Sequence, residues 1–359
     1  MPFVRRFLKC EDAKNIKAKL DGIRAEIVDG YLHPSFHLHF ARTFRGSSSD
    51  PNFQSIHNRN KVAAELIRTG FIPRDGCVLA ENDFAAHEFK IAASRWQDPA
   101  MIAYASDPSK DIHRDTGAEL FACEPDQVSK DMRQWAKNLY VFRTLYGGFY
   151  IQSAQSLWNV IVQKPDLFMK DGTTLVRDWL ARKGIKELGD CNVKEKPRRG
   201  TYELHVKGVD DRFMTKFSHF ATEKTRQYQR YLETGRFRMM TGFVVEGLYS
   251  RNAFLNYGVQ GPAFHCLLWV LIKLQKQLKK RGMRALVVGQ IHDCLLGDVP
   301  REELNEYIEM VRRLVEEGLP RHFTWLRTPL EIECEVCETN WWGKVPWVRG
   351  ANGVWAAKA

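Results

Sequence analysis

Two short apolar runs, residues 286–288 and 295–296, flank a polar group formed by Gln290, His292 and Asp293. Short apolar runs bounded by glycine and polar residues predict two strands joined by a tight turn. Such a hairpin presents its turn residues beyond the sheet, and here they include an acid and an imidazole. An ordinary core hairpin with a polar turn fits the pattern equally well, so its meaning depends on a second acid elsewhere.

That second acid is Asp83, which follows another short apolar run at residues 77–80. Residues 84–93 have helical propensity, so we expect Asp83 at a strand end and Glu88 near the positive end of a helix. Two carboxylates can hold two Mg²⁺ ions roughly 4 Å apart while leaving room for phosphate oxygens. Asp83 and Asp293 together therefore predict a two-metal site.

Residues 128–150 predict a helix with cations first and aromatic residues afterwards. Arg133 and Lys137 are four residues apart, as are Phe142 and Tyr146, so each pair shares one helix face. Such a helix can hold a triphosphate at one end and a base or ribose at the other. An amphipathic helix with solvated cations and core aromatics has the same spacing and is the alternative at this point.

The chain before residue 77 gives shorter patterns. Residues 3–23 have apolar positions at near-helical spacing and predict one or two short helices. Residues 25–40 alternate around Asp29-Gly30, which predicts a hairpin turn. The polar segment 43–54 predicts a loop whose hydroxyls and amides suit a phosphodiester backbone and groove edges, with a plain surface loop as the alternative.

The rest of the chain is mainly helical in pattern. Residues 151–245 predict helices interrupted by a basic loop at 194–200 that suits a position near nucleic acid. The other predicted elements are a helix around 213–238, a glycine-punctuated turn at 250–262, a core helix at 263–278, an amphipathic helix at 301–317 and a strand at 330–336 with an acidic exposed face.

Composition narrows the classes of protein. The chain has 359 residues, 44% of them hydrophobic, and no apolar run approaches the roughly 18 residues of a membrane helix. Its net charge of +11 favours a polyanionic partner. Eight cysteines without a framework spacing favour reduced thiols, so we expect a protein of the cytoplasm. Cys334 and Cys337 lack the second pair or the nearby histidines of a zinc site.

Taken in order, these segments resemble the polymerase module of the DNA polymerase I family (family A). Each match is short, but six of them occur in the family's order between residues 43 and 294. The matches are residues 43–54 with T-G-R-x-S-S-x-x-P-N-x-Q, 83–88 with motif A (D-Y-S-x-x-E), 111–113 with D-I-H, 133–147 with motif B (R-x-x-x-K…Y-G), 256–261 with N-x-x-x-Q-G and 290–294 with motif C (Q-V-H-D-E).

The resemblance implies a template-directed DNA polymerase that adds dNTPs to a primer 3′-hydroxyl by two-metal phosphoryl transfer in DNA replication. Its cofactor would be two Mg²⁺ ions, with Mn²⁺ as a substitute. Asp83, Asp293 and the backbone carbonyl of Phe84 would be metal ligands, and Lys137 would act with the two acids as a catalytic residue.

The resemblance also implies two sets of binding residues. Within the nucleotide site, Glu88 would pack against Tyr146 and exclude a ribose 2′-hydroxyl. The residues implied for nucleotide binding are His113, Arg133, Lys137, Phe142, Tyr146 and Glu88. Those implied for primer–template DNA, through contacts that depend little on sequence, are Arg45, Asn52, Gln54, Asn256, Gln260, Gln290 and His292.

Three departures from the family pattern stand out. Motif A has Ala85 and Ala86 where polar residues are usual, and Cys294 follows Asp293 where a Glu is usual. The distance from Lys137 to Tyr146 is one residue longer than the commonest spacing, which predicts a bulged helix and a divergent, phage-like branch. The resemblance therefore implies the cytoplasm of a bacterium or of a phage-infected host.

The implied fold is α+β with a right-hand polymerase architecture. We expect a thumb remnant at 1–24, the first part of an antiparallel-sheet palm at 25–104, helical fingers at 105–245 and the second part of the palm at 246–359. About forty residues precede the T-G-R segment, where the family places a thumb and often a 3′→5′ exonuclease domain. The chain would then be either a minimal polymerase or the polymerase half of a split enzyme. We expect the split enzyme, in which a second polypeptide supplies the thumb, the exonuclease or both.

Three other classes share part of the pattern. A single-subunit RNA polymerase has the same palm but normally lacks an acid at the position of Glu88. A non-catalytic DNA-binding accessory protein would explain the charge and the aromatic residues, yet would not need both Asp83 and Asp293. A metal-dependent nuclease also uses paired acids, but leaves the helix of Arg133 and Lys137 unexplained.

Overall fold

The computed structural model describes residues 2–38, 40–56, 61–164 and 166–358, and leaves undescribed the side chains of residues 2–12. The chain forms two compact units, each of which is described by itself. The first comprises Met1–His87, Gln260–Thr324 and Leu330–Ala359, and the second Glu88–Val259 and Trp325–Pro329. Helices and an antiparallel sheet occur together, so the α+β prediction is confirmed.

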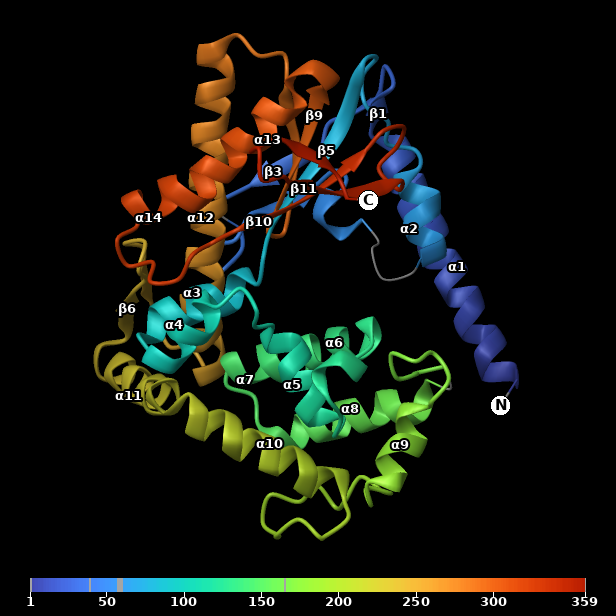
Figure 1. The fold of residues 1–359 in the computed structure, drawn as a ribbon, viewed down its shortest axis with the longest axis vertical. Helices are drawn as coiled ribbons and strands as arrows, with labels where there is room; N and C mark the ends of the chain where they lie inside the picture. Colours follow the sequence, from blue (N-terminus) through green and yellow to red (C-terminus); the bar gives the residue numbers. More distant parts are fainter. Residues whose placement is uncertain (1, 39, 57–60, 165, 359) are drawn as a thin grey trace. The chain divides into compact units, whose positions relative to one another are not determined.

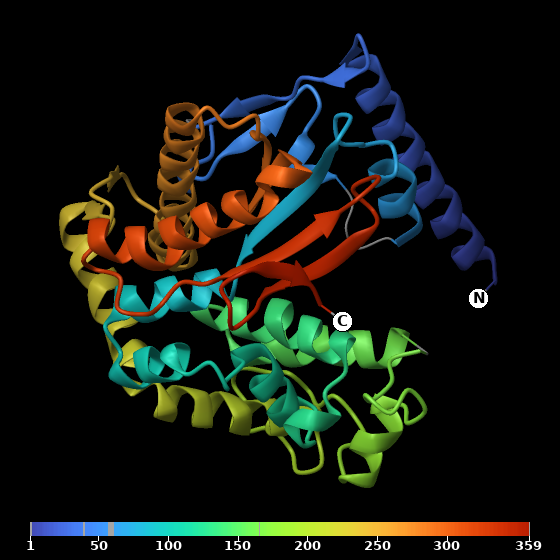
Figure 2. The ribbon, with the colours of Figure 1, turned by 45° about the horizontal axis from the view of Figure 1, so that its top comes forward.

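The first unit is built on a six-stranded sheet in which each neighbouring pair is antiparallel. Figures 1 and 2 show β5 beside the C-terminal strands. In spatial order the strands are β12 (Trp355–Ala357), β11 (Lys344–Arg349), β10 (Ile332–Cys337), β5 (Cys77–Phe84), β9 (Cys294–Pro300) and β8 (Leu286–Ile291). The predicted hairpin around His292 is confirmed as β8 and β9.

Strand β5 is covered on both faces, which explains its run of consecutive apolar residues. Residues 77–80 are all buried. Helix α13 (Leu304–Arg313) packs on one face of the sheet, across β5, β9, β10 and β12 (Figure 1). On the other face Leu79 joins a core cluster in which Phe53 and Trp341 stack with ring centroids 5.5 Å apart.

The N-terminal part of this unit contains one long helix and two short strand pairs. Helix α1 (Pro2–Ala25) is a single helix, and the side chains of Phe3 and Phe7, used to predict it, lie outside the described residues. Asp29 and Gly30 have φ values of 50° and 80°, the left-handed pair that a two-residue hairpin turn needs. They join β1 (Ile27–Val28) to β2 (Tyr31–Leu32), which confirms the predicted turn.

Two predictions near the sheet were wrong. Segment 43–54 is not simply a loop, because β4 (Ser47–Ser49) pairs with β3 (Ser35–His37) and a 3₁₀ turn spans Phe53–Ser55. The helix after β5 begins at His87 and not at Phe84. Phe84 still pairs with Ile332, and Ala86 has a left-handed φ of 48°, which breaks a helix.

The turn predicted at 250–262 was also wrong, because helix α12 runs without a break from Arg251 to Arg281. Glycine and proline at 258, 261 and 262 suggested a turn, but Val259 and Ala263 are fully buried on this helix. Packing here outweighs the roughly 3 kcal/mol preference against a proline inside a helix. The other helices of the first unit are α2 (Lys61–Arg68) and α14 (Leu319–His322), with a 3₁₀ turn at Arg301–Glu303 and a π-helical turn at Leu314–Gly318.

The second unit is a helical assembly with one small hairpin (Figure 1). The basic segment 194–200 lies in the loop between α9 (Val176–Arg182) and α10 (Tyr202–Lys216), as predicted. The helical stretch predicted around 213–238 is divided between two helices, which are separated at Phe217, and it ends at Thr234, where Gly235 adopts a left-handed cap. The helices are α3 (His87–Trp96), α4 (Pro99–Ser106), α5 (Ile112–Leu120), α6 (Lys130–Ala136), α7 (Phe142–Leu145), α8 (Tyr150–Gln163), α9 (Val176–Arg182), α10 (Tyr202–Lys216) and α11 (Ser218–Thr234), and the hairpin strands are β6 (Arg236–Arg238) and β7 (Val244–Glu246).

A single buried acid ties together two of these helices. Asp98 is 1% exposed, and its carboxylate accepts a hydrogen bond from the Met101 N–H at 2.9 Å as the N-cap of α4. Its other oxygen accepts from the Phe220 N–H at 2.8 Å, in the first turn of α11. One side chain therefore satisfies backbone donors at the start of both helices.

We expect Asp98→Ala to lower the free energy of unfolding by about 2–4 kcal/mol, because one cap is lost and a second buried N–H is left unpaired. Urea denaturation followed by circular dichroism measures the change. The exposed Asp126→Ala variant in the same unit is the control and should stay within about 0.5 kcal/mol of the parent. A parental midpoint for Asp98→Ala would contradict the double-cap interpretation.

Candidate active site

Asp83 and Asp293 lie on neighbouring strands of the six-stranded sheet. Asp83 is the penultimate residue of β5 and pairs in register with Cys294, the first residue of β9. The Phe84 N–H donates to the backbone carbonyl of Asp293 at 3.3 Å, which ties the β8–β9 turn to the end of β5. Asp83 is exposed, and the Asp293 side chain is 23% exposed. The sheet thus brings together two acids that are distant in sequence.

The Asp293 carboxylate is held between cationic and imidazole groups. One of its oxygens lies 3.4 Å from Arg45 Nη2 and 3.7 Å from His87 Nδ1. Burial opposes ionisation of this carboxyl, but His87, Arg45 and His292 outweigh it and hold the pKa of Asp293 well below its usual range. Asp293 is therefore a carboxylate throughout the neutral pH range and can bind a cation.

His87 is a residue of this site that the sequence analysis missed. Its ring is 2% exposed and stacks on Phe84, with ring centroids 4.5 Å apart. Neither ring nitrogen has a hydrogen-bond partner among the described residues, although Nδ1 is close to Asp293. A lone His between Ala86 and Glu88 gave no signal in the sequence, because its role depends on a strand two hundred residues away.

The polar residues of the turn form a small network with the segment 43–54. Gln54 Nε2 donates to Gln290 Oε1 at 2.6 Å, and Gln290 Nε2 donates to the His292 carbonyl at 2.5 Å. His292 is exposed and has a φ of 52°, the left-handed conformation of a tight turn. Three residues predicted to bind DNA are thus joined to one another.

Other residues predicted to bind DNA have different surroundings. The Asn52 side-chain oxygen accepts from Ser55 N and Ser48 Oγ, both at 3.1 Å, so it already caps the 3₁₀ turn. Asn256 and Gln260 lie half-buried on α12, in different units. The Asn256 Oδ1 atom is buried without a partner in the part of the chain that the structure describes.

Two side chains flank Asp83 on the same face of the sheet, because residues directly opposite in an antiparallel pair point the same way. Cys294 is one, and burial, with Glu81 and Asp83 nearby, raises the pKa of its thiol well above the usual value. It is therefore neutral at physiological pH. Glu333 of β10 is the other, and it is exposed. The alternating acids of residues 331–335 signalled an exposed strand face, but not that this face adjoins Asp83.

In the second unit, the predicted helix of Arg133 and Lys137 has a π-helical turn in its middle. Helix α6 ends at Ala136, the π-helical turn spans Lys137–Val141 and α7 follows at Phe142. A π turn accommodates one extra residue within a helix. It explains the extra residue between Lys137 and Tyr146, so the predicted bulge is confirmed.

This helix places its cations and aromatic residues near the start of α5. Arg133 Nε donates to Asp111 at 2.6 Å, while the other Asp111 oxygen accepts from the first backbone N–H groups of α5. Lys137 Nζ lies 5.3 Å from the centroid of the Phe142 ring, and the rings of Phe142 and Tyr146 lie 6.2 Å apart. The second unit therefore groups four of the predicted nucleotide-binding residues.

His113 lies against the same cluster, edge-to-face on Phe142 with ring centroids 5.7 Å apart. It is 2% exposed, and burial, reinforced by Lys137 and Arg133, lowers its pKa to about 3. The resemblance implies that His113 binds the nucleotide, where a protonated imidazole would add charge to the contact with phosphate. With this pKa it is a neutral imidazole at physiological pH, and only Arg133 and Lys137 supply positive charge.

Glu88 and Tyr146 meet in the second unit, as the sequence analysis expected. The Tyr146 hydroxyl donates to Glu88 Oε2 at 2.5 Å, and Glu88 is 7% exposed. Helix α3 supplies the acid and the end of α7 the tyrosine, just before Gly147, whose φ of 84° ends the helix. A buried carboxylate is thus fixed beside an aromatic ring.

The geometry of both units agrees with the comparison to known protein families. A family model described as DNA polymerase family A matches residues 1–179 and 198–343. The chain belongs to DNA polymerase family A. All six motif segments lie within the matched residues, which confirms the family resemblance.

Individual relatives of this family A chain are distant and longer. The chain is 27% identical over 314 residues to DNA polymerase I of Caldicellulosiruptor bescii, covering 87% of itself and 32% of that protein. It is 26% identical over 343 residues to the thermostable DNA polymerase I of Thermus aquaticus, covering 94% of itself and 36% of that protein. The chain therefore spans about a third of the length of these relatives.

The fold is also that of a solved polymerase domain. The structure matches the POL domain of Pol1 from M. smegmatis, which was solved in complex with DNA primer-template and dNTP. The TM-score is 0.74 at 22% sequence identity, covering 95% of this chain and 53% of the other. Within the described part of the chain, no helix is both long and apolar enough to cross a membrane. The seven cysteines whose side chains are described are free thiols.

The lowered pKa of His113 predicts acid-sensitive stability. Because the unfolded imidazole binds protons more readily, this contribution is complete above pH 6.5 and is lost as the pH falls toward 3. Between pH 6.5 and pH 5, protonation of the unfolded imidazole should lower the free energy of unfolding by about 2 kcal/mol. Over the same pH range, the free energy of unfolding of His113→Leu, measured by urea denaturation, should therefore fall by about 2 kcal/mol less than that of the parent. Above pH 8 the two proteins should respond alike, and an equal loss at pH 5 would contradict the assignment.

Proposed function

We propose that this chain is a template-directed DNA polymerase that joins dNTPs to a primer 3′-hydroxyl during DNA replication. The observation that supports this most is the register of β5 and β9, which sets Asp83 and the Asp293 turn side by side. Family membership and the fold shared with a domain solved with primer-template and dNTP add independent support.

The two aspartates are suitable ligands for Mg²⁺, and Mn²⁺ would suit the same oxygens. Asp293 is ionised and partly exposed, Asp83 is exposed, and carboxylate oxygens are the hard donors that these ions prefer. Asp83 and Asp293, with the Phe84 carbonyl, would hold the ions. No three His, Cys, Asp or Glu side chains of the described residues are grouped as a metal site by themselves. When bound, Mg²⁺ lowers the pKa of the attacking hydroxyl and offsets the phosphate charge.

The helix of the second unit would bind the triphosphate. Arg133 and Lys137 provide the positive charge for the β- and γ-phosphates, while neutral His113 provides a ring that can form a hydrogen bond without adding charge. Lys137 would also stabilise the charge that develops on the departing group, which is its catalytic role. Phe142 would stack near the sugar and base, and Tyr146 would flank the new base pair.

In the reaction, the primer 3′-oxygen forms a bond to the α-phosphorus while the bond from that phosphorus to the bridging oxygen breaks. Pyrophosphate leaves with the electron pair, and the hydroxyl proton passes to solvent or a nearby base. Arg45, Asn52, Gln54, Asn256, Gln260, Gln290 and His292 would contact the primer–template. The internal hydrogen bonds of Gln54 and Gln290 would hold these amides in a fixed orientation for minor-groove acceptors.

We expect Asp83→Asn and Asp293→Asn each to lower primer extension by at least about 10³-fold, because each removes a carboxylate that holds the metal ions. Binding of labelled primer–template, measured by fluorescence anisotropy, should change little. Glu302→Gln removes an exposed acid and serves as the control. Parental extension in either aspartate variant would contradict the proposed catalytic role, and a wild-type chain that binds DNA but never extends it would favour the accessory-protein alternative.

Glu88 provides the test against an RNA polymerase. Replacing it by Ala opens space beside Tyr146, so rNTP incorporation should rise relative to dNTP incorporation by roughly 10–100-fold. Single-nucleotide extension with matched dNTP and rNTP measures the ratio. Tyr146→Phe, which keeps the ring and the carboxylate but removes their hydrogen bond, separates steric exclusion from positioning. A parental enzyme that prefers rNTPs would contradict the proposal.

A second polypeptide that carries a thumb or an exonuclease stays a prediction. Affinity purification of the tagged chain from its source, followed by native mass spectrometry, tests it. Recovery of the chain alone, together with fully processive synthesis by that chain, would contradict the prediction.

A further inference from the structure

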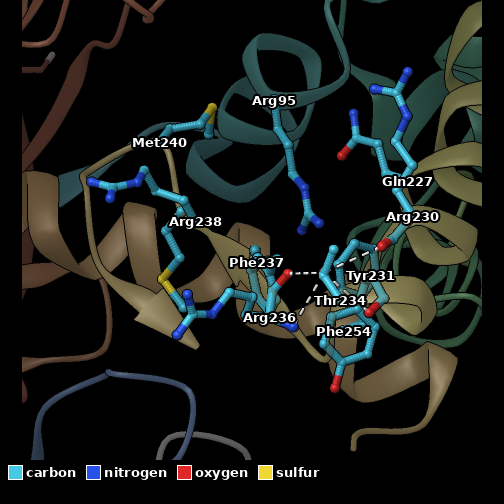
Figure 3. A pocket seen from close by; sticks show the side chains of 12 residues that line it. Arg95, Gln227, Arg230, Tyr231, Thr234, Arg236, Phe237, Arg238, Met240 and Phe254 are labelled. Atoms are coloured by element: carbon cyan, nitrogen blue, oxygen red, sulfur yellow. Dashed lines mark hydrogen bonds between the residues drawn. The ribbon is translucent and has the colours of Figure 1, made fainter. Parts of the chain in front are cut away.

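A cavity of about 420 Å³ in the second unit is lined by four arginines and by no acidic residue. Figure 3 shows Arg95 pointing into it from α3, with Gln227 and Arg230 of α11 nearby and the β6 hairpin below. Arg236 and Arg238 complete the set. None of the four arginines belongs to the six motif segments or to the proposed catalytic site, although Gly258, which also lines the cavity, lies in the segment 256–261.

Arg95 is the central feature of this cavity. Its Nη1 donates to the Leu255 carbonyl at 2.9 Å, and its guanidinium carbon lies 4.2 Å from the Trp96 ring centroid and 5.1 Å from that of Phe254. Among the described residues no carboxylate forms an ion pair with it. A guanidinium has five N–H donors, so most of them are left for a ligand. Burial lowers the Arg95 pKa to about 9, which leaves the group charged at neutral pH.

The backbone makes room for this guanidinium. A Cβ atom at Gly258 would lie 1.6 Å from Arg95 Nη1, so the observed position of the side chain requires glycine there. Gly258 lies in the continuous helix α12 and has no left-handed φ, so a turn does not explain it. The close approach keeps the charged head at the cavity wall, packed between aromatic rings.

The other arginines add charge that is only partly neutralised. Arg236 pairs with Glu246 across the β6–β7 hairpin. No ion pair involves Arg230 or Arg238 among the described residues, and Arg238 makes a 3.5 Å hydrogen bond to the Gly242 carbonyl. Arg230, Arg236 and Arg238 are exposed, and of these Glu246 neutralises only Arg236 among the described residues, so the cavity keeps a net positive charge that favours an anionic ligand.

We propose that this cavity is a binding site for a phosphate group of a nucleotide, either in a DNA strand or in a free nucleotide. Planar guanidinium groups match phosphate oxygens in a bidentate manner. The half-buried ring of Phe237 offers a surface on which a base can stack. The volume is large enough for a nucleotide-sized ligand. The site is independent of the proposed polymerase chemistry and would bind phosphate even in a chain that catalyses nothing.

The test measures binding of labelled single-stranded oligo(dT) to the full chain in EDTA, by anisotropy over roughly 50–200 mM salt. Arg230→Gln/Arg238→Gln should lower the slope of log K against log salt by about 1.4, because each phosphate contact with single-stranded DNA contributes about 0.7. Gly258→Ala, which removes no charge but displaces Arg95, should weaken binding severalfold at the lowest salt. The matched control is Arg212→Gln/Arg226→Gln, which removes two cations that are paired to Glu119 and Glu223 and are not among the residues lining the cavity.

Competition by dAMP and by inorganic pyrophosphate separates the two sources. If dAMP or pyrophosphate binds the parent and this binding is lost in both cavity variants, the site accepts a free nucleotide. If neither competes while the oligonucleotide slope falls as expected, the ligand is a DNA strand. The proposal would be overturned if Arg230→Gln/Arg238→Gln had the same slope as the control and Gly258→Ala bound with parental affinity. Tighter binding of oligoglutamate than of oligo(dT) would also overturn it.

Discussion

The register between β5 and β9 is the constraint on which the candidate active site depends. Side chains alternate along a strand, so a slip of one residue would turn Asp83 to the opposite face, against α13. Burial fixes the register, because Leu79 and Leu296 must join the core with Phe53 and Trp341 while Ala80 and Gly297 lie on the other face. The position of the acids is therefore determined by apolar residues that take no part in chemistry.

The same logic extends to the residues around Asp293. Arg45 belongs to the segment 43–54, whose Phe53 lies in that core, and Gln54 directly follows Phe53 in the chain. The stacking of Phe53 on Trp341 therefore anchors the segment that supplies Arg45 to Asp293 and Gln54 to Gln290. His87 reaches Asp293 from the residues just after β5. Arg45 and His87 thus reach the carboxylate from two segments, one anchored by Phe53 in the core and the other following β5.

Sequence patterns predicted the local parts of this arrangement well. Asp29-Gly30, the β8–β9 hairpin and the extra residue after Lys137 each have a signal within a few residues, and the structure confirms all three. The continuous helix α12 escaped prediction because its glycines and proline are tolerated only through tertiary packing. His87 and the cavity of Arg95 escaped it for a related reason. Their surroundings come from segments far apart in the chain, and no local spacing records that.

The substitution at Cys294 becomes clearer in this sheet. The thiol is neutral and lies opposite Asp83, so this position adds no negative charge beside the aspartate. Glu333 lies opposite Asp83 on its other side, in β10, and is exposed. Beside Asp83, β10 therefore provides a carboxylate and β9 a neutral thiol. These side-chain neighbours are set by the register of the strands and not by adjacency in the sequence.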